Sequence, residues 1–278
     1  MAVWLQHLLP KRALTQAVGR LAAAQGGAWT TAAIRRFVQR YGVDMSEAAE
    51  PDISRYASFN DFFTRPLREG ARPLAQATWV SPVDGAVSQL GPIVDGHIFQ
   101  AKGHEYTAQA LLAGDASDAQ RFAKGSFATL YLSPRDYHRI HMPCAGRLTR
   151  MVYVPGDLYS VNPATAAAVP GLFARNERVV CHFDTDHGAM AMVLVGATIV
   201  GSVATVWHGS VHPPRHAKPR QWDYAAGQID LAQGEEMGRF LLGSTVVVLW
   251  SRGDLGFMPT WQAAAPIRMG QAMAELMA

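Results

Sequence analysis

MAMVLVGATIVGSVATV, residues 190–206, is rich in Val, Ile and Thr, the residue types that favour β-strands. Gly196 and Gly201 interrupt it, which predicts two strands or one bent strand. Shorter runs of the same kind lie on both sides of it, separated by Gly, Pro and Asp: SFATLYL (126–132), LTRMVYV (148–154), RVVCHF (178–183) and TVVVLW (245–250). This pattern predicts a β-rich core, barrel-like or sandwich-like, from about residue 76 to residue 278.

The N-terminal region has a different pattern. Residues 13–25 and 30–41 place apolar side chains at helical spacing, and Gly26-Gly27 separates the two segments. The residues up to 43 include no Asp or Glu, but they include Lys11, Arg12, Arg20, Arg35, Arg36 and Arg40. Amphipathic helices with basic faces favour an anionic membrane surface, although a helical cap docked on the core remains an alternative.

The fold class expected is therefore α+β, with an N-terminal amphipathic helical region over residues 1–75 and a β-rich core over 76–278. Ser58 and Asp61 have the spacing of a capping box and predict a short helix. Pro66 and Pro73 mark a linker after it. Residues 207–236 are expected to form a long loop, and residues 262–278 to be partly helical.

Composition narrows the class of protein. Of 278 residues, 49% are hydrophobic and 17% charged, which supports a large core rather than disorder. A net charge of +3 is too small to indicate nucleic acid as a partner. No apolar run is long enough to span a bilayer, and the N-terminus does not resemble a signal peptide. The only cysteines, Cys144 and Cys181, are expected to be buried thiols in a reducing cytoplasm.

Three polar stretches could carry chemistry. Asp84 lies in a Val-Asp-Gly turn, His138 and His141 lie in YLSPRDYHRIHMP (131–143), and Ser244 follows Gly243 immediately before the run 245–250. Each is ordinary when taken alone: a turn Asp, a polar loop and a turn Ser. Together they supply the three groups that activate a hydroxyl. A zinc site built on the histidines is not expected, because no third ligand stands at a fixed spacing.

Seven ordered stretches make the chain resemble the bacterial phosphatidylserine decarboxylases, a family of pyruvoyl-dependent enzymes. They are VDGAVSQLG (83–91), QAKGHEYTAQALLAG (100–114), YLSPRDYHRIHMPCAG (131–146), YVPGDLYSVN (153–162), FARNERVV (173–180), VGATIVGS (195–202) and EMGRFLLGSTVV (236–247). The similarity runs from the N-terminal helices to about residue 250. It is weaker beyond, where this chain looks short.

The resemblance implies a self-cleaving proenzyme. Asp84, His141 and Ser244 match the family's self-cleavage triad, and cleavage at Gly243-Ser244 would give a β chain, 1–243, and an α chain, 244–278. Ser244 would become a covalent pyruvoyl group, the only cofactor, and no metal is implied. That group would form a Schiff base with phosphatidylserine and release CO2 and phosphatidylethanolamine. His138 matches a residue implicated in decarboxylation and is our candidate proton donor.

The same resemblance implies a peripheral enzyme at the cytoplasmic side of the cell membrane, a homodimer whose β and α chains stay associated, and no nucleic-acid partner. Three alternatives remain open from the residues alone. One is a Ser-His-Asp hydrolase that never cleaves itself, and another is a non-catalytic membrane scaffold. The third is a related pyruvoyl decarboxylase that acts on an archaeal-type lipid or a soluble amino acid.

Overall fold

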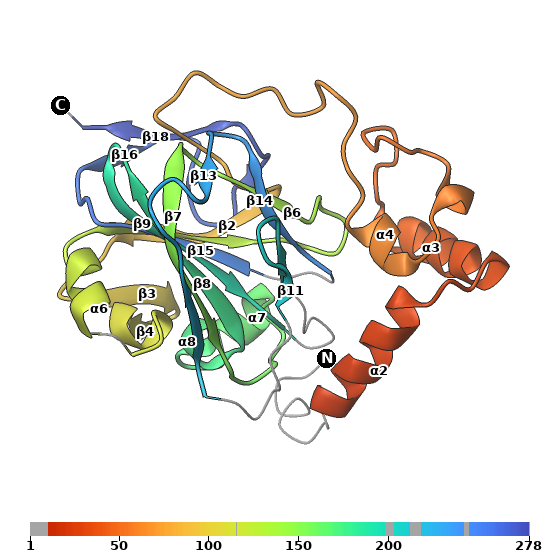
Figure 1. Ribbon diagram of the computed structural model, residues 1–278, viewed down its shortest axis with the longest axis horizontal. Helices are drawn as coiled ribbons and strands as arrows, with labels where there is room; N and C mark the ends of the chain where they lie inside the picture. The colour runs from red at the N-terminus through yellow and green to blue at the C-terminus, as the bar shows by residue number, and fades with distance from the viewer. Residues whose placement is uncertain (1–10, 115, 198–202, 212–217, 242–244, 278) are drawn as a thin grey trace.

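The computed structural model describes residues 11–114, 116–197, 203–211, 218–241 and 245–277. Its centre is a mainly antiparallel sheet, which Figure 1 shows in the middle of the molecule. The strands, in spatial order, are β12 (Arg220–Asp223), β7 (Gly146–Val154), β8 (Arg178–Thr185), β9 (Gly188–Val195), β15 (Thr245–Trp250), β5 (Ser126–Tyr131), β2 (Gly85–Pro92) and β17 (Pro266–Ile267), while β13 (Asp230–Leu231) also pairs with β7.

Two smaller sheets and a hairpin complete the β structure. One sheet has the order β11 (Gly209–Val211), β10 (Val203–Thr205), β14 (Glu236–Phe240) and β6 (Arg139–His141). Another has the order β1 (Trp79–Val80), β18 (Ala272–Leu276) and β16 (Leu255–Phe257), and β3 (His97–Ala101) pairs with β4 (His104–Thr107). The sheets are open, which confirms a β-rich α+β fold, and none is closed into a barrel.

The central strands of the main sheet are buried on both faces. In β9, Met190, Met192 and Leu194 belong to one apolar cluster, and the alternating residues Ala191, Val193 and Val195 belong to another. The first cluster includes residues of the two smaller sheets. The second includes residues of β3, β4 and the short helices α5 (Ala108–Leu111), α6 (Ala116–Phe122), α7 (Pro163–Ala166) and α8 (Leu172–Arg175). A strand covered on both sides needs a continuous apolar run, which is why 190–195 and 245–250 do not alternate with polar residues.

The N-terminal helices lie beside the sheets (Figure 1). They are α2 (Lys11–Ala23), α3 (Ala28–Tyr41), the 3-10 turn η1 (Ile53–Arg55) and α4 (Phe59–Phe63). Gly42 ends α3 in the left-handed conformation, and the Ser58–Asp61 capping box opens α4 as expected. A small apolar cluster of Ile34, Val43, Tyr56, Phe62 and Phe63 holds this region together. The domain boundary after residue 75 stays a prediction.

Two local expectations are wrong. Residues 207–236 contain β11, β12 and β13 rather than one long loop; of these residues, 212–217 lie outside the described part. Residues 262–278 form β17 and β18 through residue 276 instead of a helix. The run 190–206, in contrast, does become two strands, β9 and β10, which belong to different sheets. Residues 198–202, between the two, are not among those described.

Cys144 and Cys181 are both buried free thiols, as expected. Burial raises the pKa of the Cys144 thiol to about 12, so this side chain behaves as a small apolar group. Within the described residues, no helix combines the length and the apolar character needed to cross a bilayer.

Candidate active site

The candidate site lies at one end of the main sheet, where β15 and β2 begin and β5 ends. Thr245 of β15 pairs with Tyr131 of β5, and Tyr131 pairs on its other side with Ala86 of β2. Since neighbouring strands are about 4.8 Å apart, Thr245 and Ala86 are separated by roughly 10 Å. The predicted cleavage pair Gly243-Ser244 lies outside the described residues, and Thr245 is the first described residue after it.

Gly85 brings Asp84 to this end of the sheet. Its φ is +151°, and a Cβ there would lie 2.2 Å from the carbonyl oxygen of Tyr131. No L side chain fits so close to a backbone oxygen, so only glycine allows β2 to pair with β5 immediately after the turn. The Asp-Gly pair is thus required by strand packing as well as by the turn.

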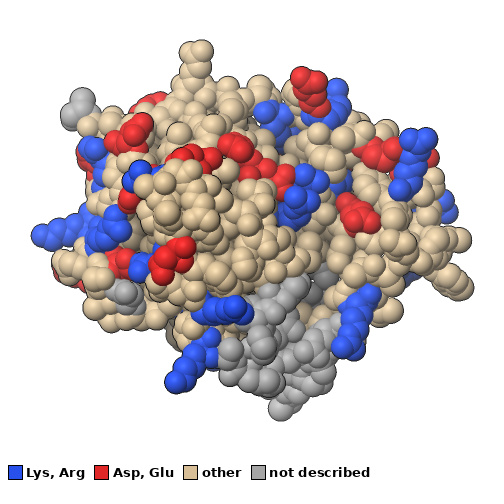
Figure 2. Space-filling view, viewed as in Figure 1, with Lys and Arg blue, Asp and Glu red and all other residues tan. Residues whose placement is uncertain are grey.

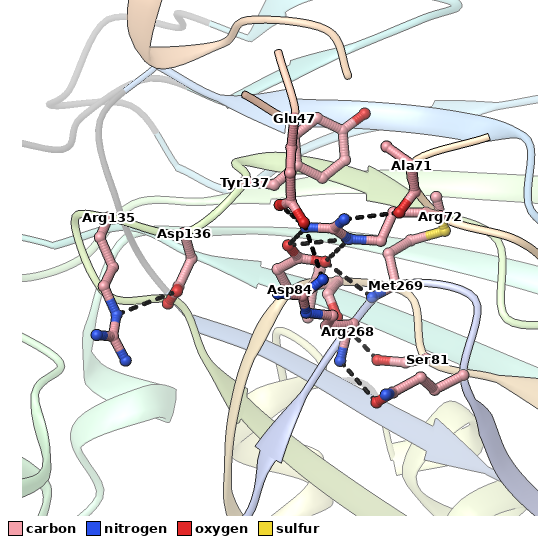
Figure 3. Close-up of polar contacts among 12 residues, drawn as sticks. Glu47, Ala71, Arg72, Ser81, Asp84, Arg135, Asp136, Tyr137, Arg268 and Met269 are labelled. Carbon is pink, nitrogen blue, oxygen red and sulfur yellow. Dashed lines mark hydrogen bonds and ion pairs between the residues drawn. The ribbon is translucent and has the colours of Figure 1, made fainter. Parts of the chain in front are cut away.

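Asp84 is 7% exposed, and its carboxylate accepts four hydrogen bonds, three from the Arg72 guanidinium and one from a backbone N–H. Arg72 donates from Nε to Oδ1 at 2.9 Å and from Nη2 to Oδ2 at 2.5 Å, and the backbone N–H of Met269 donates to Oδ1 at 2.9 Å. Arg72 Nη2 also contacts Glu47 at 2.7 Å, and Glu47 in turn pairs with Arg268 at 2.8 Å. Figure 3 shows these charged side chains grouped around Asp84.

The Arg72 guanidinium is the centre of this network. Burial lowers its pKa, but the hydrogen bonds to Asp84 and Glu47 outweigh burial and raise the pKa above its usual value. The network ties together three separate parts of the chain: the segment after α3, the linker before β1, and the C-terminal residues 268–269. We expected none of these partners from the sequence.

His141 lies on β6 and is anchored to the Asp84 turn by its backbone, whose N–H donates to the carbonyl of Pro82 at 2.9 Å. Its Nδ1 is 2.8 Å from the carbonyl oxygen of Gly234, which can only accept, so Nδ1 carries the hydrogen. Nε2 therefore holds the lone pair and accepts from the hydroxyl of Tyr137 at 2.9 Å. Burial is the main cause that lowers the pKa of His141, so the ring is neutral near pH 7.

Asp84 and His141, both described in full, do not hydrogen-bond to each other. The carboxylate faces Arg72 and Met269, while both ring nitrogens have other partners. The carboxylate does act on the ring through space, since its charge raises the pKa of His141 by a smaller amount than burial lowers it. The structure brings two members of the expected triad to one end of the sheet, and the triad itself stays a prediction.

His138 is completely buried, with its ring centroid 4.0 Å from that of Phe63. Its Nδ1 donates to the carbonyl of Asp136 at 2.7 Å, which leaves the lone pair on Nε2. Nε2 has no hydrogen-bond partner among the described residues. Burial lowers the pKa of the ring to about 3. A neutral imidazole of this tautomer accepts a proton at Nε2 before it can donate one.

His138 is also joined to the strand that leads toward the predicted cleavage site. Its carbonyl accepts from the backbone N–H of Phe240, the last residue of β14, at 3.0 Å. The described part of the chain contains no group of three or more His, Cys, Asp and Glu side chains placed to hold a metal ion.

Sequence reasoning missed five polar residues of this site: Glu47, Arg72, Arg268, Tyr137 and the buried Arg65. Glu47, Arg65 and Arg72 lie in the N-terminal region and the linker, where isolated charges usually face solvent, and Arg268 lies near the C-terminus. Tyr137 stands within the stretch already singled out, immediately before His138, and its adjacency was the one available signal.

Comparison with known proteins identifies the family. The family model described as phosphatidylserine decarboxylase matches residues 59–275, and a second model, described as PSD, matches residues 1–42. The match therefore continues past residue 250, beyond the similarity seen in the sequence motifs.

Curated relatives are similar over nearly the whole chain. A phosphatidylserine decarboxylase proenzyme of Acidovorax ebreus is 69% identical over 275 residues, which cover 99% of this chain and 97% of the relative. The proenzyme of Chromobacterium violaceum is 68% identical over 97% of each chain, and that of Delftia acidovorans is 66% identical over 99% of this chain and 97% of the relative. With this level of identity and a family model that spans most of the sequence, the chain belongs to the phosphatidylserine decarboxylase family.

Proposed function

We propose that this chain is a proenzyme that cleaves itself at Gly243-Ser244, converts Ser244 to a pyruvoyl group, and then decarboxylates phosphatidylserine to phosphatidylethanolamine. The observation that carries the proposal is the pair of buried, neutral histidines, His138 and His141, at the end of the sheet where β15 begins. Both rings have their lone pair on Nε2, the form that can remove a proton from a hydroxyl.

In the proposed cleavage, the hydrogen bond from the Tyr137 hydroxyl to Nε2 of His141 first breaks. Nε2 then takes the hydroxyl proton of Ser244. The Ser244 oxygen then forms a bond to the Gly243 carbonyl carbon. The His141 imidazolium returns the proton to the Ser244 nitrogen as the Gly243–Ser244 C–N bond breaks, so that the peptide bond becomes an ester with a free Ser244 amine. The negative charge of Asp84 stabilises the imidazolium through space. Gly243 suits this step because it leaves the attacked carbonyl uncrowded.

Elimination then removes the Cα proton of Ser244 and breaks its Cβ–O bond, so that Gly243 leaves as a carboxylate. The resulting dehydroalanine tautomerises to an imine. Water hydrolyses the C=N bond of this imine to a ketone, and the nitrogen leaves as ammonia. The product is a β chain, 1–243, and an α chain, 244–278, that begins with a ketone. β15 is buried between β9 and β5, which supports continued association of the two chains.

Two buried polar atoms support a carbonyl group beside β15. His138 Nε2 and Thr245 Oγ1 are both buried and have no hydrogen-bond partner among the described residues. When present, a pyruvoyl ketone supplies an electron sink for the carbanion that CO2 loss creates on an amino acid. His138 is the residue we propose to move the proton: its Nε2 takes up a proton first and then delivers it to the substrate carbon.

We also propose that the N-terminal helices bind an anionic membrane at its cytoplasmic face. Leu21 and Trp29 are exposed large apolar side chains of α2 and α3, at 74% and 85%. At the lower right of Figure 2, where α2 lies in Figure 1, Lys or Arg side chains reach the surface. Deleting residues 1–42 should abolish flotation with anionic liposomes; unchanged flotation would refute this placement. A homodimer remains part of the proposal, with sedimentation velocity as its test.

The activity is tested with purified wild type and Ser244→Ala on liposomes that contain phosphatidylserine. Thin-layer chromatography should show phosphatidylethanolamine with the wild type and none with Ser244→Ala. A Ser-His-Asp hydrolase would instead release fatty acid from an uncut chain. Formation of phosphatidylethanolamine by the Ser244→Ala protein would overturn the proposed role of Ser244.

A further inference from the structure

A polar cavity of about 440 Å³ opens beside Asp84, between the N-terminal region and the β core. The segment after α3, the linker before β1, the loop before His138 and the C-terminal residues 266–271 all contribute to its lining. Four arginines are among the lining residues: Arg65, Arg72, Arg135 and Arg268. Their charges are not equally neutralised, and this difference defines what the cavity can bind.

Arg72 and Arg268 are already paired. Arg72 donates to Asp84 and Glu47, and Arg268 donates to Glu47 at 2.8 Å. Arg135 is 68% exposed in its side chain and stands 3.9 Å from the Asp136 carboxylate, a loose contact; Figure 3 shows this pair to one side of the Asp84 cluster. Arg135 thus keeps donors free for another anion.

Arg65 differs from the other three arginines in being buried without an ion pair to a described carboxylate. It is 4% exposed and makes no ion pair with a described carboxylate. Within the described part of the chain, its Nε has no hydrogen-bond partner, and Nη2 reaches only the carbonyl of Arg135 at 3.4 Å. Its guanidinium carbon is 5.3 Å from the Phe62 ring centroid. The carboxylates of Asp84, Asp136 and Glu47 act on this cation only through space, and burial still lowers its pKa. A buried cation without a carboxylate in contact is costly, and a bound anion would reduce that cost.

We propose that this cavity binds the phosphodiester of the lipid substrate, with Arg65 as the principal donor and Arg135 closing the site from the solvent side. This inference rests on the proposed decarboxylation. A guanidinium offers a planar fork that matches two phosphate oxygens. The cavity is close to the reacting groups, because Asp84 and Tyr137 line it and the charge of Arg65 is felt by His138.

Phosphatidylserine carries two anionic groups, and the chemistry decides between them. The carboxylate loses its charge as CO2 leaves, so an arginine bound to it would stabilise the substrate more than the transition state. The phosphodiester keeps its charge throughout the reaction. An arginine on the phosphodiester therefore strengthens binding without opposing the chemical step. Only three bonds separate the phosphorus from the α-carbon, so both groups can be held at one site.

The test uses the mature, self-cleaved enzyme and soluble dihexanoyl phosphatidylserine. Arg65→Gln should raise KM by roughly tenfold or more, equivalent to about 1.4 kcal/mol, with a much smaller change in kcat. Arg65→Lys, which keeps the charge but not the fork, should fall between. The matched control is Arg55→Gln, because Arg55 is 72% exposed, pairs with Glu50 and does not line the cavity; its KM should match the wild type.

Competition identifies the anion. Dihexanoyl phosphatidylglycerol has the phosphodiester but neither amine nor carboxylate, and it should inhibit the wild type competitively and Arg65→Gln at least tenfold more weakly. Inorganic phosphate should inhibit only at far higher concentrations. Equal inhibition by inorganic phosphate would make this a free-anion site and overturn the proposal. So would phosphatidylglycerol inhibition that Arg65→Gln leaves unchanged.

Two measurements separate this inference from the proposed function and from misfolding. Complete self-cleavage on a denaturing gel and a wild-type melting temperature show that a variant is folded; if Arg65→Gln fails either, Arg65→Lys carries the test alone. If the wild type turns over substrate and a folded Arg65 variant has the same KM, the phosphate site is refuted and the proposed decarboxylase function still stands. No turnover by the wild type would instead refute the proposed function.

Discussion

Substitution of Arg72 by Gln should destabilise the protein strongly, because Arg72 is the counter-charge of two carboxylates. The side chains of Arg72 and Asp84 are 5% and 10% exposed, and that of Glu47 is 20% exposed. Without the guanidinium, Asp84 keeps only the Met269 N–H, and Glu47 keeps only the partly exposed Arg268. Removing one member of a buried pair typically costs about 3–5 kcal/mol, and we expect a loss in that range.

A matched control separates burial from geometry. Arg252 holds Asp254 with the same two-point contact, from Nε at 2.8 Å and from Nη2 at 2.5 Å, but this pair stands in solvent. Water and salt screen such a pair, so Arg252→Gln should leave the stability close to that of the parent. The two variants therefore remove the same two-point contact in two different environments, and Arg72→Gln also removes the contact with Glu47.

The assay is urea denaturation of the uncleaved Ser244→Ala background, followed by circular dichroism, so that one intact chain is compared throughout. The free energy of unfolding should fall by about 3 kcal/mol or more in Arg72→Gln. If Arg72→Gln loses no more stability than Arg252→Gln, the buried network does not hold Asp84 and our description of the site is wrong.

Three further predictions follow from the same geometry. Gly85→Ala should destabilise the protein far more than Gly91→Ala in thermal melts, because both glycines have φ near +150° but only at Gly85 would a Cβ meet a backbone oxygen, at 2.2 Å; equal losses would contradict the close approach. Burial lowers the pKa of His138 to about 3 in the folded protein, whereas the same side chain has a pKa of 6.5 in the unfolded chain. The unfolded chain therefore binds the proton first as the pH falls. The free energy of unfolding should decrease below pH 6.5, by about 2 kcal/mol at pH 5. His138→Gln should remove this contribution in urea titrations and leave that of His141, whose pKa burial also lowers; an unchanged pH profile would argue against a neutral His138 ring. His141→Gln should slow self-cleavage by about 10²–10⁴-fold on denaturing gels, the range for loss of a general base, and normal cleavage would exclude it as the base.

The core strands could be predicted because their residues and their surroundings agree. β9 and β15 are buried on both faces, so their Val-rich runs are both locally and globally suited to a strand. The C-terminal residues were not predictable in this way. Ala, Met and Glu favour helices, yet 272–276 form β18 because β1 and β16 offer it hydrogen bonds on both sides. There, tertiary pairing outweighs local preference.

The site shows the same division. Asp84, His138 and His141 could be named because they stand in dense, distinctive stretches that resemble a known family. Arg65, Arg72 and Glu47 could not, because each is a single charge in a segment that reads as linker or surface. Only the folded chain shows that Arg72 meets a carboxylate 12 residues away and another 25 residues away. The tautomer of His141 also depends on the carbonyl of Gly234, 93 residues along the chain, and was beyond reach from the sequence.

The most direct test of the proposed function is the mass of the denatured, purified wild-type protein. We predict two chains, 1–243 and 244–278, with the second lighter by one ammonia than a chain that begins with serine and able to react with a hydrazide at its N-terminal ketone. A single chain of 278 residues after prolonged incubation, or a second chain that begins with an unmodified serine, would contradict the account.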